Sequence, residues 1–109
     1  MSAAAERAFE RLAARFSGRR GISQGTGFGT NPGLRVKSKI FAMIVSGELV
    51  VKLPRDRVDQ LVEAGEAARF DAGKGRPMKE WASVSSKHRR RWQQLADEAF
   101  ELVEAGGRE

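Results

Sequence analysis

The stretch KIFAMIVSGELVVKL, residues 39–53, decides the fold of this 109-residue chain. Every position from 40 to 45 is apolar, which is typical of a strand that is central in its sheet or covered on both faces. Ser46-Gly47 supplies a two-residue turn, because glycine takes a positive φ at no steric cost. The stretch therefore predicts a β-hairpin whose return strand directs one row of side chains inward, namely Leu49, Val51 and Leu53.

Three amphipathic helices are predicted around this hairpin. Residues 3–16 repeat apolar side chains at helical spacing and stop at Ser17-Gly18. Pro54 suits the first turn of a short helix that ends at Gly65. A last helix, capped by Ser85 or Ser86, continues to Gly106-Gly107. Its apolar positions are Trp92, Leu95, Ala96, Ala99, Leu102 and Val103.

Two further short strands are predicted at residues 68–71 and 80–84. Because the connections between strands are short, the sheet should be mostly antiparallel. The sequence thus predicts an α+β, two-layer domain with about five strands and N-terminal, middle and C-terminal helices. We expect the core to include Phe9, Phe41, Ile44, Leu49, Val51, Trp81 and Leu95.

Length and composition predict one domain over residues 1–109, with an ordered core at roughly 5–104. No apolar run reaches the roughly 18 residues that a membrane span needs. The N-terminus lacks the apolar segment of a signal peptide, and Glu6 and Glu10 argue against a mitochondrial presequence. We therefore expect a cytoplasmic protein with no membrane association. The chain has no cysteine, which excludes disulfides and thiolate chemistry.

The net charge of +6 and the pI of about 10.5 favour an acidic partner, above all nucleic acid. Arginine is far more frequent than lysine, beside much alanine, glycine and valine, and genome composition alone produces such a bias. Both explanations remain open at this point.

Basic residues are concentrated in particular segments. In the first helix they repeat at i, i+4 and i+8, and in the last helix they crowd the N-terminal end while carboxylates crowd the C-terminal end. In the last helix, the macrodipole favours the opposite arrangement, with carboxylates at the N-terminal end and basic residues at the C-terminal end. Either the basic end meets phosphate or another acidic partner, or two copies pair antiparallel, or solvent screens the charges at little cost. The candidate binding residues are Arg7, Arg11, Arg15, Arg19, Arg20, Arg35, Lys37, Lys39, Lys87, Arg89, Arg90 and Arg91.

The glycine-rich segment GISQGTGFGTNPG, residues 21–33, resembles a phosphate-binding loop only superficially. A Walker loop needs Lys and then Ser or Thr after its last glycine, and Leu34 stands there instead. The dinucleotide fingerprint needs a helix to follow, and here a strand follows. Backbone N–H groups in this segment or in GKGR, residues 73–76, remain a weaker option for anion binding. A plain loop is the favoured interpretation of both.

The sequence supplies little for catalysis. The single histidine, His88, lies within KHRRR, where neighbouring cations disfavour its charged form. No serine has an evident base partner, and the carboxylates lack the spacing of metal ligands. We expect a protein that is not an enzyme, with no metal and no cofactor.

The hairpin followed, after a short helix, by RFDAGKGRPMKEWASV resembles the TfoX/Sxy N-terminal-domain family, which is similar in fold to the MmcQ/YjbR proteins. The resemblance covers roughly residues 5–104. It departs from the family pattern at Thr30, where a second glycine is common, and at Lys37-Ser38, where the first hairpin often turns on Asp-Gly. It is carried by Phe28-Gly29, Phe41-Ala42, Gly47-Glu48-Leu49, Lys52, Phe70, Pro77-Met78 and Trp81.

This resemblance implies a stand-alone N-terminal-type domain with no known catalytic residues. The leading expectation is a small non-enzymatic interaction domain with a regulatory role, which binds nucleic-acid phosphates or an acidic protein. The alternatives are a protein–protein module or homodimer without a nucleic-acid role, and an enzyme or small-ligand binder. One continuous basic face across both terminal helices would favour the first, and scattered charge the second.

Overall fold

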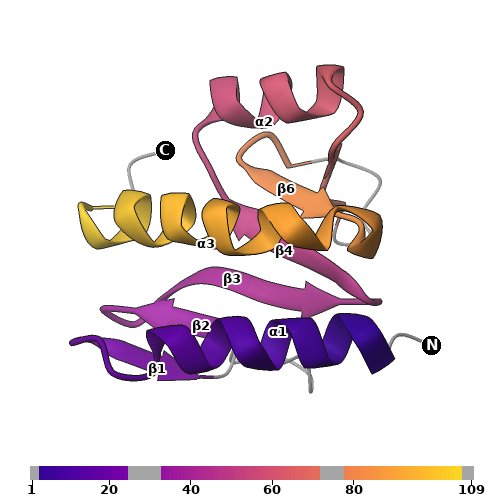
Figure 1. The fold of residues 1–109 in the computed structure, drawn as a ribbon. Coiled ribbons are helices and arrows are strands. Elements are labelled where there is room, and N and C mark those ends of the chain that lie inside the picture. The colour runs from indigo at the N-terminus through magenta and orange to yellow at the C-terminus, as the bar shows by residue number, and fades with distance from the viewer. Residues whose placement is uncertain (1–2, 25–32, 72–77, 107–109) are drawn as a thin grey trace.

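The computed structural model describes residues 3–24, 33–71 and 78–106. It is an α+β fold in which three helices pack against an antiparallel sheet (Figure 1), as the sequence predicts. The helices are α1 (Ala3–Phe16), α2 (Arg55–Glu63) and α3 (Arg89–Glu104), with a 3₁₀ turn, η1 (Ser86–His88), before α3. The strands are β1 (Ile22–Gln24), β2 (Gly33–Val36), β3 (Lys39–Val45), β4 (Glu48–Lys52), β5 (Ala68–Arg69) and β6 (Trp81–Val84).

The six strands lie in the order β1-β2-β3-β4-β6-β5, and every neighbouring pair is antiparallel. The predicted hairpin forms the two central strands, which explains why β3 is apolar on both faces. Ile44 pairs with Leu49, and both belong to the core on the helix side. The adjacent pair, Met43 and Val50, alternates to the opposite face and is also buried.

Two tight turns fix the register of the central strands. Ser46 and Gly47 join β3 to β4 with φ of 52° and 78°, as expected for the hairpin turn that follows strand twist. Lys37 and Ser38 join β2 to β3 with φ of 54° and 71°. That second turn has the same backbone conformation without a glycine, so two side chains occupy a region that L-residues disfavour.

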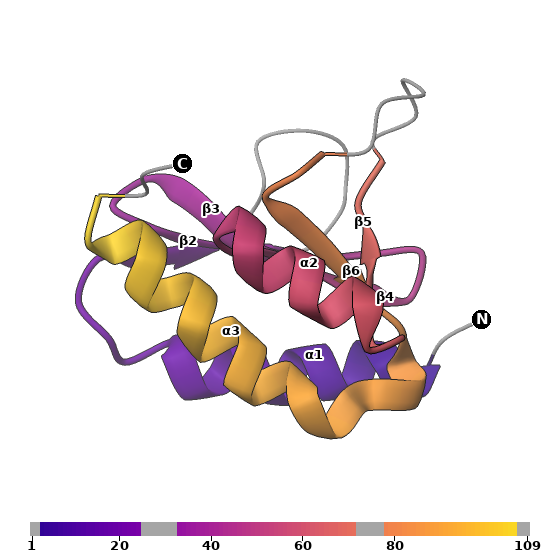
Figure 2. The same ribbon diagram turned by 90° about the horizontal axis from the view of Figure 1, so that it is seen from above.

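The helices cover one face of the sheet (Figure 2). A cluster of three aromatic rings joins α1, β3 and α3, with ring centroids 5.1 Å apart for Phe16 and Phe41, 5.4 Å for Phe16 and Phe100, and 5.5 Å for Phe41 and Phe100. α2 adds Val58 and Leu61 at the β5–β6 end. Six of the seven predicted core residues are buried, namely Phe9, Phe41, Ile44, Leu49, Val51 and Leu95.

The seventh predicted core residue, Trp81, lies outside the core, and that prediction is wrong. Ala82 and Val84 are the β6 residues that face the helices, so alternation places Trp81 on the opposite face. There it is half-buried, with Lys52 Nζ 5.6 Å from the centroid of its ring. The tryptophan of the core is Trp92 on α3, which is only 2% exposed.

The start of α3 is fixed by a short capped turn. The Ser85 hydroxyl accepts a hydrogen bond from the backbone N–H of Lys87 at 3.1 Å, so Ser85 caps η1, and α3 begins at Arg89. The indole N–H of Trp92 donates to the Ser85 carbonyl oxygen at 3.3 Å. These bonds hold the basic segment at a fixed place beside α1.

Candidate nucleic-acid interface

α1 and α3 pack against each other on the same face of the sheet (Figure 1), and a groove of about 280 Å³ lies between them. Two arginines come from each helix. Arg11 and Arg15 come from α1, and Arg89 and Arg90 come from the first turn of α3. The remaining lining residues are Ala8, Leu12, Trp92 and Gln93.

Helical periodicity builds this groove from two amphipathic faces. Leu12 is 4% exposed and Trp92 is 2% exposed, so each helix buries an apolar residue in the core. Arg11 and Arg15 stand one and three positions from Leu12, so they lie at the edge of the buried stripe of α1. Arg89 and Arg90 stand three and two positions before Trp92 at the start of α3. The groove is therefore lined by apolar residues and by arginines of both helices.

The groove is strongly positive, because its lining, as far as the structure describes it, holds four arginines and no carboxylate. Arg89 Nη1 donates to the Ser86 carbonyl oxygen at 2.9 Å. Within the described ranges, the side chains of Arg11, Arg15 and Arg90 have neither a hydrogen bond nor an ion pair. Like charges that converge without counterions repel one another, and an anion in the groove would relieve that repulsion.

The positive surface continues around the start of α3. Arg89 and Arg90 also line a second hollow of about 640 Å³, together with Ser86, Lys87, His88 and the paired side chains of Arg91 and Glu66. On α1, exposed Arg7 extends the arginine row one turn toward the N-terminus. The structure thus brings six predicted binding residues onto one surface that spans both terminal helices: Arg7, Arg11, Arg15, Lys87, Arg89 and Arg90. We call this surface the basic face.

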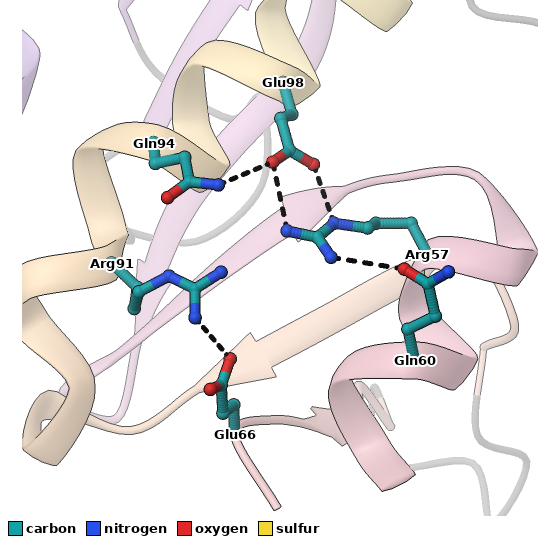
Figure 3. A network of polar contacts seen from close by, with 6 residues as sticks. All are labelled: Arg57, Gln60, Glu66, Arg91, Gln94 and Glu98. Atoms are coloured by element: carbon teal, nitrogen blue, oxygen red, sulfur yellow. Dashed lines mark hydrogen bonds and ion pairs between the residues drawn. The ribbon is translucent and has the colours of Figure 1, made fainter. Parts of the chain in front are cut away.

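Arg91, a further predicted binding residue, is engaged within the chain. Its Nη1 donates to Glu66 Oε1 at 2.7 Å (Figure 3). Its Nε is buried and has no hydrogen-bond partner among the residues the structure describes. Since one residue corresponds to about 100° around a helix, Arg91 points toward the segment after α2 while Arg90 points into the groove. We therefore leave Arg91 out of the basic face.

A direct link between α2 and α3 lies beside that ion pair. Arg57 donates to both carboxylate oxygens of Glu98, from Nε at 2.9 Å and from Nη2 at 3.1 Å (Figure 3). Gln60 and Gln94 complete the network with bonds of 3.2 Å each. These contacts occupy Glu98, so part of the acidic half of α3 already has its counterion.

The remaining predicted binding residues lie elsewhere. Arg19 places its guanidinium carbon 4.8 Å from the ring centroids of both Phe16 and Phe100, which gives it a structural role at the edge of the aromatic cluster. Arg35 is half-buried in β2 between two core residues, so it faces away from the helices. Lys37 Nζ donates to the Glu104 carbonyl oxygen at 3.1 Å, at the far end of α3. Arg20 and Lys39 are exposed, and neither lines the groove.

Gln93 and Ala8 also line the groove, although neither was predicted from the sequence. Gln93 follows Arg89 by four positions, so helical spacing alone could have placed it on the arginine side of α3. Its amide nitrogen donates to Asp97 Oδ1 at 3.0 Å. Ala8 has a small side chain that leaves room between the helices, and nothing in the sequence marks it.

Other chemistry is sparse in the described part of the chain. No three His, Asp or Glu side chains there come close enough to hold a metal ion. The helices in the same ranges are all too short or too polar to cross a membrane. The glycines of residues 25–32 and the GKGR segment at 73–76 lie outside the described residues, as do Phe28-Gly29, Thr30 and Pro77.

Comparison with known proteins gives no match: no family model, no curated protein and no solved structure is detectably similar to this chain. The resemblance to the TfoX/Sxy N-terminal-domain family therefore stays a prediction. Function has to be argued from the basic face.

Proposed function

We propose that this protein is a small non-enzymatic interaction domain that binds nucleic acid through phosphate contacts on its basic face. The observation that carries the proposal is the groove between α1 and α3, where Arg11, Arg15, Arg89 and Arg90 converge without a lining carboxylate. A regulatory role in the cytoplasm is compatible with such binding.

The arrangement of the arginines supports a polyanion with repeated charges. Arg7, Arg11 and Arg15 follow one another at successive turns of α1, about 6 Å apart along the helix axis. Guanidinium groups donate several hydrogen bonds in a fixed geometry that matches phosphate oxygens. An acidic protein could also pair with this surface, but its carboxylates would have to follow the same row. A nucleic-acid backbone supplies that regular row of charges at any sequence.

A titration with matched variants tests the proposal. Fluorescently labelled DNA is titrated with protein at about 20 mM salt, where phosphate contacts are strongest. We expect R11A/R90A to weaken binding by at least about tenfold. The control R55A/K79A removes the same charge from exposed residues outside the groove, and it should bind nearly as well as the unchanged protein.

Two results would contradict the proposal. Absence of binding by the unchanged protein at about 20 mM salt would exclude a phosphate-binding role. Equal weakening by R11A/R90A and R55A/K79A would show that the groove has no special part in DNA binding, because the control residues line a separate hollow beside Trp81. If the unchanged protein does not bind, sedimentation would test the alternative that the protein is a homodimer. In that dimer the basic start of α3 would meet the exposed Glu101 and Glu104 of a second copy.

A further inference from the structure

The basic face differs from surfaces that bind single strands, because among the described residues it presents no exposed aromatic ring. Around the groove, Trp92 is 2% exposed, Phe9 is 4% exposed and Phe16 is fully buried. The indole N–H of Trp92 is already bonded to Ser85. Sites for single strands stack bases on aromatic side chains, and each stacked base contributes about 1–3 kcal/mol. The groove cannot supply that contribution.

The more accessible aromatic residues of the described chain are remote from the groove. Phe70 and Trp81 are half-buried at the β5–β6 end of the sheet. Trp81 lies on the sheet face opposite the helices, where it packs with Lys52. A strand whose phosphates occupied the groove would have to pass around the sheet to stack a base on Trp81.

The groove also has little to read a base or a ribose. Gln93 is the one neutral polar side chain among the described lining residues apart from the buried indole of Trp92, and its amide nitrogen already donates to Asp97. Direct readout of sequence depends on side chains that pair with base edges, and recognition of RNA depends on contacts to the 2′-hydroxyl. Charge is therefore the main property by which this surface can select a nucleic acid.

Charge alone favours a duplex. Double-stranded DNA carries one negative charge per about 1.7 Å of helix axis, and it releases about 0.9 counterion per contact against about 0.7 for a single strand. We propose that the basic face binds double-stranded DNA in preference to single-stranded DNA, through its backbone and without regard to sequence. This inference rests on the proposed function and adds the class of nucleic acid.

The test compares three labelled probes with the same number of phosphates: a hairpin duplex of mixed sequence, the same duplex with a scrambled sequence, and oligo-dT. With four phosphate contacts, the slope of log K against log salt should be about −3.6 for the duplexes and about −2.8 for oligo-dT. The two duplexes should bind equally, and both should bind more tightly than oligo-dT. R11A/R90A should reduce the duplex slope to about −1.8, and R55A/K79A should leave it unchanged.

The outcomes separate this inference from the proposed function. If no probe binds, both fail. If oligo-dT binds as tightly as the duplexes, the duplex preference is wrong while phosphate binding stands. A loss of oligo-dT binding in the Trp81→Ala variant would then locate a stacking site on the opposite sheet face. A duplex preference that disappears in R11A/R90A and persists in R55A/K79A supports the inference, provided that circular dichroism shows all variants folded.

Discussion

Replacing Trp92 by alanine tests how the fold holds the groove together. The side chain is 2% exposed and packs where α3 meets α1 and the sheet. Removing a buried tryptophan costs about 3–5 kcal/mol, because contacts are lost and a cavity remains. The substitution also removes the indole hydrogen bond of 3.3 Å to the Ser85 carbonyl oxygen. Against a total stability of about 5–15 kcal/mol for a typical domain, this is a large fraction.

The chain contains a matched control, since Trp81 is its other tryptophan. Trp81 is half-buried and lies outside the core. Partial burial together with the cation–π contact from Lys52 gives an expected cost of about 1–2 kcal/mol for Trp81→Ala. The two substitutions remove the same atoms, so the difference between them reflects the burial and the contacts of each side chain and not its size.

Urea unfolding followed by far-ultraviolet circular dichroism measures both free energies, because that signal comes mainly from the backbone and not from tryptophan fluorescence. We expect Trp92→Ala to lower the free energy of unfolding by about 3–5 kcal/mol and to shift the midpoint far more than Trp81→Ala does. A third variant, Trp92→Phe, keeps an aromatic ring and loses the N–H donor, so its cost should be intermediate. Equal effects of the two alanine substitutions would refute the assignment of Trp92 to the core and Trp81 to the far face.

Two further predictions concern one ion pair and one strained turn residue. Arg57→Ala should lower the free energy of unfolding by about 1–2 kcal/mol, because it breaks the two-bond link to Glu98. Arg90→Ala should change the free energy of unfolding by less than about 0.5 kcal/mol. Urea unfolding of both variants checks this, and equal costs would contradict it. Ser38→Gly should raise the free energy of unfolding by about 0.5–1 kcal/mol, because Ser38 has a φ of 71° that glycine adopts without strain. Thermal unfolding measures this. A lower melting temperature of the variant would show that the serine side chain stabilises the fold by more than the backbone strain costs.

Much of the fold was predictable because its strongest signals are local. Residues 39–53 carry continuous apolar character and a glycine at the turn, and together they predict the central hairpin. The wrong prediction for Trp81 has a local cause too. β6 has only four residues, so its alternation fits either face, and only pairing with β4 decides that Ala82 and Val84 point inward.

The candidate site was predictable only in part. The arginine row of α1 follows from the helical period, and so does the basic start of α3. That the two rows line one groove depends on how α1 packs against α3, which no local pattern encodes. Arg90 lines the groove while Arg91 pairs with Glu66, which lies 25 residues earlier in the chain. This difference likewise depends on the direction of each side chain, which the sequence pattern does not give.

Charge clustering alone suggests a triple replacement of Arg89, Arg90 and Arg91 as a test of binding. The structure makes that variant a poor test. Losing Arg91 would also leave Glu66 without its ion-pair partner and disturb the contact with the segment after α2. Effects on folding and on binding would then be mixed. R11A/R90A avoids this, because neither side chain has a described partner.

Amide chemical-shift mapping with a hairpin DNA duplex at low salt tests the central claim most directly, because it locates contacts residue by residue on the intact protein. The account predicts perturbations that concentrate at residues 7–15 of α1 and 87–93 at the start of α3, and that fade as salt is raised. Arg55 and Lys79 should show little change. Perturbations centred on Trp81 and the opposite sheet face, or no perturbation at all, would contradict the claim that the groove between α1 and α3 binds nucleic-acid phosphates.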